Sequence, residues 1–116
     1  MSPQPLEEVK VLDCTQFMAG PYCSLLLADM GADVVKVERP GVGDETRHQA
    51  PTINGVAAPF LMVNRNKRSL VLDLKALEGQ ETFRRLASRF DVVLENYRPG
   101  TFERLGLGYE DLKPLN

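Results

Sequence analysis

The sequence predicts an α/β fold in which a parallel sheet carries helices on both of its faces. Short runs rich in β-branched residues, such as DVVKVE at Asp33–Glu38 and DVVLE at residues 91–95, alternate with longer stretches of helical periodicity. The first two of these runs and the stretch between them have the length of one βαβ unit, about 30 residues. Strands that alternate with helices in this way are typical of parallel sheets.

The first βαβ unit has clear start and stop signals. Residues 9–14 (VKVLDC) are the first predicted strand. A helix is expected to begin near Pro21, because proline suits the first helical position, and to end at Met30 before a left-handed Gly31. A right-handed crossover then leads to the second strand, Asp33–Glu38.

The pattern loosens after the second strand and becomes regular again near residue 69. Residues 40–68 form a long connection, and such connections within a compact domain are commonly functional. The remaining predicted elements are a helical candidate at residues 60–64, a strand at 69–74, an amphipathic helix at 77–89, a strand at 91–95, a short helix capped by Thr101 and a turn at 109–112. Because the alternation next requires a strand, we interpret the chain as the amino-terminal part of a larger domain.

Composition limits the classes of protein to consider. The chain has 116 residues, 43% of them hydrophobic, which suffices for one modest core. Its net charge of −2 argues against nucleic-acid or anionic-membrane partners. No apolar run is long enough to span a membrane. Cys14 and Cys23 are not spaced as a redox or metal pair, so we expect reduced, small core residues in a cytoplasmic protein.

Polar residues follow several predicted strands, at the edge of the sheet where ligands of parallel α/β proteins bind. The stretch at residues 33–47 (DVVKVERPGVGDETR) is central, because its strand delivers Glu38 and Arg39 into a glycine-containing loop. Arg39, Lys75 and Arg104 could hold phosphate oxygens. Neither GxGxxG nor GxxxxGK[ST] occurs, which disfavours ordinary dinucleotide or P-loop binding.

Four motifs occur in a characteristic order: AGP at residues 19–21, KVERPGVGDETR at 36–47, NKRS at 66–69 and VLENYRPG at 93–100. In this combination they resemble the amino-terminal part of class III (family III) CoA-transferases, the relatives of formyl-CoA transferase, carnitine CoA-transferase and α-methylacyl-CoA racemase. The resemblance covers nearly the whole chain. It implies that residues 1–116 are a Rossmann-like CoA-binding segment of an enzyme that works as an interlocked homodimer.

The resemblance also implies a function and a set of ligand contacts. These enzymes move CoA between an acyl-CoA thioester and a carboxylic acid through an aspartyl anhydride, without a prosthetic group. The family's nucleophilic aspartate lies beyond position 116, so no aspartate of this chain is expected to be catalytic. The expected CoA contacts are Phe17, Met18, Ala19, Arg39, Leu72, Lys75, Asn96, Tyr97 and Arg104.

Two alternatives remain open from the sequence. One is a 2-methylacyl-CoA racemase, and the other is a non-catalytic CoA- or nucleotide-binding module or a remnant. Met18 stands where the resembled formyl-CoA transferase has a glutamine, which favours a larger or less polar acid than formate. The acyl donor and acceptor are otherwise left open by the sequence.

Overall fold

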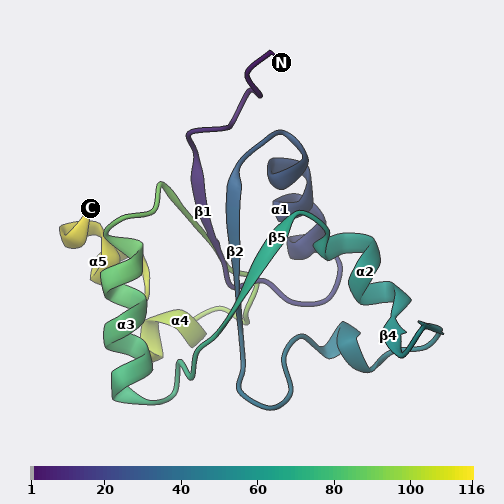
Figure 1. The fold of residues 1–116 in the computed structure, drawn as a ribbon. Helices are drawn as coiled ribbons and strands as arrows, with labels where there is room; N and C mark the ends of the chain where they lie inside the picture. Colours follow the sequence, from purple (N-terminus) through teal and green to yellow (C-terminus); the bar gives the residue numbers. More distant parts are fainter. Residues whose placement is uncertain (1) are drawn as a thin grey trace.

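The computed structural model describes residues 2–116 and contains a parallel sheet with helices on both faces (Figure 1). The elements are β1 (Lys10–Asp13), α1 (Ala19–Asp29), β2 (Asp33–Glu38), η1 (Glu45–His48), β3 (Thr52–Ile53), β4 (Val56–Ala57), α2 (Ala58–Asn64), β5 (Lys67–Val71), α3 (Leu77–Ala87), β6 (Val92–Leu94), α4 (Thr101–Arg104), α5 (Tyr109–Leu112) and η2 (Lys113–Leu115). The predicted fold class is therefore confirmed.

The strand order of the main sheet is β5-β2-β1-β6, with every neighbouring pair parallel. The chain runs from β1 outward through β2 to β5 and then returns to the other side of β1 with β6. This is the order of the first four strands of a Rossmann fold, in which the direction of strand addition reverses beside the first strand. Ligands of such sheets bind at this reversal, beyond the carboxyl ends of the strands.

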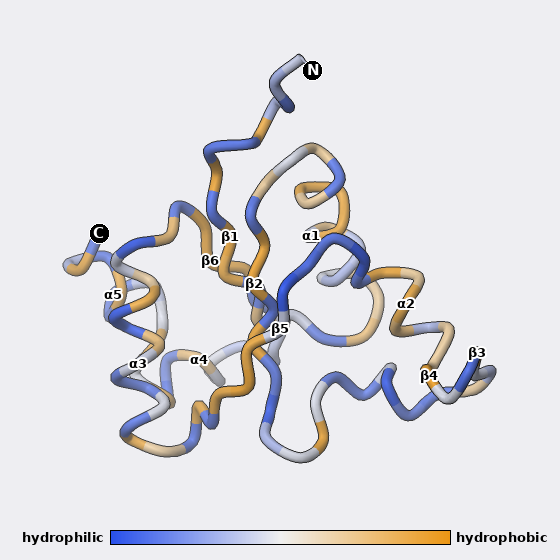
Figure 2. Tube along the Cα trace, in the orientation of Figure 1, coloured by the Kyte–Doolittle hydropathy of each residue, from blue (hydrophilic) through white to orange (hydrophobic). Residues whose placement is uncertain are grey.

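Alternate residues of β1 and β2 enter two different cores, because successive side chains of a strand point to opposite faces. Leu12 and Val35 pack with Phe83 of α3 on one face, whereas Val11 and Val34 pack with α1 on the other. Figure 1 shows α1 on one side of the sheet and α3, α4 and α5 on the opposite side. In Figure 2 the central strands β1 and β2 show orange, apolar stretches that are interrupted by blue, polar ones.

The long connection between β2 and β5 is ordered as a series of small elements. Asp44 begins η1 by accepting a hydrogen bond from the backbone N of Thr46. Asn54 and Gly55 both have positive φ and form the two-residue turn of the β3–β4 hairpin, as primed turns require. The predicted helix at residues 60–64 is confirmed as the longer α2, which packs against α1.

Several predicted boundaries are wrong, for identifiable reasons. Helix α1 begins at Ala19 rather than Pro21, and the proline lies in the first turn, where it removes no helical hydrogen bond. The third strand is Lys67–Val71 rather than 69–74 because β5 pairs only with β2, and its ladder ends opposite Glu38. Thr101 does not cap α4: Gly100, with φ of 86°, holds the cap position. Cys23 is exposed, so only Cys14 is the predicted core residue.

Candidate functional site

The loops that follow β1 and β6 are joined at the point where strand addition reverses. We call residues 15–18 the first loop. The backbone N of Gln16 donates to Asn96 Oδ1 at 2.9 Å, and Asn96 Nδ2 donates to the carbonyl oxygen of Gln16 at 2.8 Å. Gln16 Nε2 also donates to the hydroxyl of Tyr97 at 3.1 Å. The sheet edge at which ligands of this fold class bind is therefore bounded by these two loops.

The loop after β2 forms the third side of this edge. Arg39 donates to Glu45 and, at 3.4 Å, to the carbonyl oxygen of Gly43. The side chains of Arg39 and Glu45 are 45% and 42% exposed, so both can meet a ligand. A shallow depression lies between this loop and the first loop and is lined by Gln16, Arg39 and Gly43.

A buried cluster of charged side chains lies beneath the first loop. Lys36 of β2 pairs with Asp44 at 2.8 Å, and Lys67 of β5 pairs with Asp13 of β1 at 3.2 Å. All four side chains are at most 2% exposed. Because charges buried in this way are costly unless paired, the two lysines and two aspartates balance one another.

Both aspartates accept hydrogen bonds from the surrounding residues. Asp13 accepts from the backbone N of Thr15 at 2.9 Å and from the hydroxyl of Ser24. Burial alone would raise the pKa of Asp44, but bonds from Lys36 and Thr46 outweigh it and lower that pKa below its usual value. Burial lowers the pKa of the Lys67 ammonium, and the charge of Asp13 opposes this shift.

A third buried carboxylate, that of Glu38, fixes the loop after β2. Arg47 donates to both oxygens of Glu38, from Nε and Nη2, at 2.7 Å each. Ser69 and the backbone N of Asp44 donate to the same carboxylate. Burial would raise the pKa of Glu38, but these bonds outweigh it and lower the pKa to about 2. Arg47 also lies over the ring of Phe60, 3.7 Å from its centroid, and so connects the loop to α2.

The structure brings together five of the residues predicted to contact a ligand. Phe17 and Met18 are half exposed on the first loop, where the hydrogen bonds described above join Asn96 and Tyr97 to Gln16, and Arg39 follows the adjacent strand. Tyr97 also stacks on Phe102, with ring centroids 5.4 Å apart, and burial raises the pKa of its hydroxyl.

The other four predicted contacts have different surroundings. Ala19 is exposed at the start of α1. Leu72 continues β5 by donating its backbone N to the carbonyl oxygen of Glu38, and its side chain packs against the core. Lys75 is exposed before α3, and Arg104 donates to the hydroxyl of Thr101 within α4. No hydrogen bond or ion pair among the described residues joins Lys75 or Arg104 to the first loop.

Sequence reasoning missed Lys36, Asp44, Asp13 and Lys67. The signal for Lys36 was available: a lysine stands inside DVVKVE, a run that reads as a strand buried on both faces. Because lysine is almost never fully buried unless paired, its position in that run required a buried acidic partner. The identity of the partner, six residues beyond the strand end, depends on the turn that follows.

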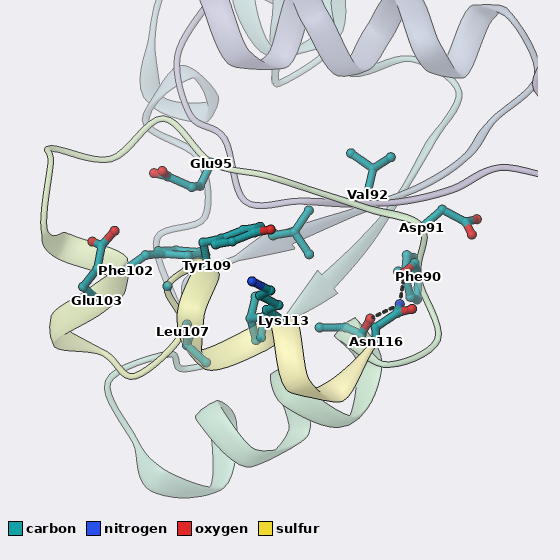
Figure 3. A pocket seen from close by; sticks show the side chains of 14 residues that line it. Phe90, Asp91, Val92, Glu95, Phe102, Glu103, Leu107, Tyr109, Lys113 and Asn116 are labelled. Atoms are coloured by element: carbon teal, nitrogen blue, oxygen red, sulfur yellow. Dashed lines mark hydrogen bonds between the residues drawn. The ribbon is translucent and has the colours of Figure 1, made fainter.

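A cavity of about 530 Å³ lies away from this edge, beside β6 (Figure 3). Its wall includes Val92 and Glu95 of the β6 region, Tyr109 of α5 and Lys113 of η2. Its lining runs along β6, from Asp91 before the strand to Glu95 after it, and includes no residue of the first loop. Among residues 2–116, no helix is both long enough and apolar enough to cross a membrane.

The fold and the edge define a class of protein: a Rossmann-like α/β chain whose ligand edge is built from the loops after β1, β2 and β6. The chain belongs to CoA-transferase family III, whose sequence profile matches residues 6–116. The family resemblance noted from the sequence motifs is thereby confirmed.

Individual relatives agree with this assignment. The chain is 52% identical over 116 residues to succinyl-CoA:mesaconate CoA-transferase of Haloarcula hispanica, covering 96% of this chain and 29% of that protein. It is 45% identical over 113 residues to formyl-CoA:oxalate CoA-transferase of Escherichia coli, covering 97% of this chain and 27% of that protein.

Among solved structures, Rv3272 of Mycobacterium tuberculosis matches with a TM-score of 0.93 and 44% identity, covering all of this chain and 33% of that one. The chain thus spans about a third or less of the length of the relatives it matches.

Proposed function

We propose that the chain is the CoA-binding segment of an enzyme that transfers CoA between an acyl-CoA thioester and a carboxylic acid. The observation that carries the proposal is the meeting of the first loop, Arg39 and Asn96 at the reversal point of the sheet, in a member of CoA-transferase family III. Residues 1–116 would supply one unit of the site. The remainder of a longer protein, and a second copy in a homodimer, would complete it.

Each of the nine predicted contacts has a role in this proposal. The cations Arg39, Lys75 and Arg104 would bind the phosphates of CoA, since guanidinium and ammonium groups pair well with phosphate oxygens. The residues Phe17, Met18 and Ala19 would lie toward the thioester. The residues Leu72, Asn96 and Tyr97 would shape the crevice between these two groups.

The nucleophile of the proposed reaction would come from outside this segment. Its carboxylate oxygen would attack the thioester carbon, the carbon–sulfur bond would break, and CoA would leave as the thiolate while an acyl anhydride remains. Asp13 and Asp44 are buried and paired with Lys67 and Lys36, so neither carboxylate can reach a ligand. This supports a nucleophile that lies outside the segment.

The acyl group that we propose is larger or less polar than formyl. Phe17 and Met18 are 50% and 49% exposed and present an apolar surface next to the ligand edge. The reaction would take place in the cytoplasm, and the free thiols of Cys14 and Cys23 suit such a reducing compartment.

The experiment is a calorimetric titration of the full-length protein with CoA at two salt concentrations, together with an Arg39→Ala variant. Loss of one charged hydrogen bond to phosphate should weaken binding about tenfold or more. Higher salt should weaken binding to the unaltered protein.

Arg68→Ala is the matched control, because Arg68 is exposed and pairs with Asp33 at the opposite end of β2. This variant should bind CoA like the unaltered protein. No heat with CoA, or equal weakening by both substitutions, would contradict the proposed site. Racemisation of a 2-methylacyl-CoA without transfer to an added acid would contradict the proposed reaction.

A further inference from the structure

The backbone of the first loop is held by side chains along most of its length. Asp13 accepts from the backbone N of Thr15 at 2.9 Å, and Lys36 Nζ donates to the carbonyl oxygen of Thr15 at 2.9 Å. Asn96 binds both the N and the carbonyl oxygen of Gln16. The N of Phe17 donates to Asp44 Oδ1 at 3.4 Å. Five consecutive backbone polar groups thus have side-chain partners.

This restraint maintains an unfavourable conformation at a position facing the ligand edge. Phe17 has φ of 68°, in the left-handed region that aromatic residues rarely adopt. Such a conformation persists only where the surroundings enforce it, and it commonly occurs at functional sites. Here the conformation leaves the side chains of both Phe17 and Met18 half exposed.

Lys36 and Asp44 connect this loop to the rest of the site. Lys36 reaches the first loop from inside β2, and Asp44 reaches it from the loop that also contains Arg39. The two side chains bind each other at 2.8 Å while each contacts the first loop. The loop after β1 and the loop after β2 are therefore held in one fixed relation by a single buried pair.

We propose that Lys36 and Asp44 are positioning residues, which hold the first loop in the conformation that presents Phe17 and Met18 to an acyl-CoA. This inference rests on the proposed function, because it takes CoA as the ligand at this edge. The pair itself does not touch the ligand. It acts by keeping the loop in the competent conformation before the ligand arrives, which removes a cost of ordering from binding.

The test separates positioning from stability with two double variants of the full-length protein. The first double variant combines Lys36→Met with Asp44→Asn. It removes the side-chain donor to the carbonyl oxygen of Thr15 and keeps an acceptor for the backbone N of Thr46. Because both members of the ion pair are neutralised, no buried charge is left unpaired. Its melting temperature should exceed that of the single Lys36→Met variant, because the single variant leaves the Asp44 carboxylate buried without its cation. Lys36→Gln with Asp44→Asn is equally neutral but keeps a side-chain donor near Thr15.

The expected results differ between these two variants. If the loop is competent in about one molecule in ten without the donor, the Met-containing double variant should bind CoA about tenfold more weakly. The Gln-containing variant should remain within about threefold of the unaltered protein by the same relation. Backbone amides of residues 16–18 should exchange hydrogen faster in the first variant than in the second, measured by mass spectrometry without CoA.

The outcomes distinguish this inference from the proposed function. If both double variants match the unaltered protein in CoA affinity and amide exchange, the positioning role is overturned, even if the unaltered protein binds CoA. Equal weakening of both would overturn the role given to the Lys36 donor. Failure of the unaltered protein to bind CoA would overturn the proposed function and this inference with it. The control is Arg68→Met with Asp33→Leu, which removes an ion pair at the far end of β2 and should change neither measurement.

Discussion

At the scale of single residues, the site depends on charged side chains that face inward as much as on those that face the solvent. The side chains of Lys36, Asp44 and Glu38 are almost completely buried, and each is bound to the backbone or to a partner of opposite charge. Arg39 and Glu45, in contrast, are half exposed and pair at the surface. The buried groups determine where the loops lie, and under the proposed function the exposed pair would determine what charge a ligand meets.

Replacing Arg47 with methionine should destabilise the protein at neutral pH by about 2 kcal/mol, because Glu38 is then left buried without its cation. The pKa of Glu38 is about 2 in the folded protein against an ordinary value of 4.5, so its contribution is full above about pH 4.5. That contribution is lost as the pH falls through about 2.

Urea unfolding at several pH values measures this effect. The difference in free energy of unfolding between the unaltered protein and Arg47→Met should shrink steadily from pH 5 toward pH 2. Arg85→Met, at an exposed position of α3, serves as the control and should show little difference at any pH. A difference for Arg47→Met that does not depend on pH would show that the ion pair is not its cause.

Replacing Glu45 with glutamine should strengthen CoA binding about threefold, because the carboxylate competes with phosphate for Arg39 and an exposed pair of this kind is worth under about 1 kcal/mol. Calorimetry at low salt measures the change. Glu81→Gln alters the net charge equally on the outer face of α3 and should have a smaller effect. If both variants bind equally well, the local pairing of Arg39 does not matter for the ligand.

At the scale of helices and strands, close backbone contacts fix where α3 begins. Gly79 is buried in the first turn of α3, and a Cβ atom there would lie 1.8 Å from the carbonyl oxygen of Asp73. This approach is possible only for glycine. It places α3 against the segment that leaves β5, and therefore sets the path of the residues that include Lys75.

Gly79→Ala should destabilise the protein by about 2 to 3 kcal/mol, although in a helix interior alanine is ordinarily more favourable than glycine by about 1 kcal/mol. The physical reason is that the Asp73 backbone must move to admit the methyl group. Thermal and urea unfolding measure the effect, with Glu81→Ala in the same helix as the control. Unchanged or raised stability of Gly79→Ala would contradict the contact.

The elements differ in how well the sequence predicts them. The bounds of β2 were predicted correctly, because a β-branched run lies between Gly31 and Pro40. Those of β5 were not, because an edge strand takes its limits from the ladder with its neighbour and not from its own apolar residues. The sequence could place the polar residues that follow the strands, such as Gln16, Arg39 and Asn96, at one edge of the sheet, because parallel strands end there together. The buried cluster beneath it could not be assembled, because its pairs join separate segments of the chain.

At the scale of the whole molecule, apolar surface remains uncovered on α1. Leu25 and Ala28 are buried, and Ala28 packs with Val11 and Val34 of the sheet. Tyr22, Leu26 and Met30, in contrast, recur every fourth residue and are 41–55% exposed. A helix that is apolar on more than one side is usually buried on more than one side. This surface suits a contact with the remainder of a longer protein or with a second copy.

The 116-residue chain should therefore self-associate as its concentration rises, and Leu26→Lys should reduce this association. Sedimentation velocity over a range of concentrations measures it. Leu77→Lys is a matched control, because Leu77 is 82% exposed at the start of another helix and lies outside the row on α1. Equal association of the two variants would show that the α1 surface is not responsible.

The restraint of the first loop also has an evolutionary consequence. The backbone from Thr15 to Phe17 is anchored by the side chains of Asp13, Lys36, Asp44 and Asn96, and not by the side chains at positions 17 and 18. Natural variation can therefore exchange those two side chains without refolding the loop. Under the proposed function, one scaffold would in this way acquire preferences for acids of different size, while the elements beneath it remain unchanged.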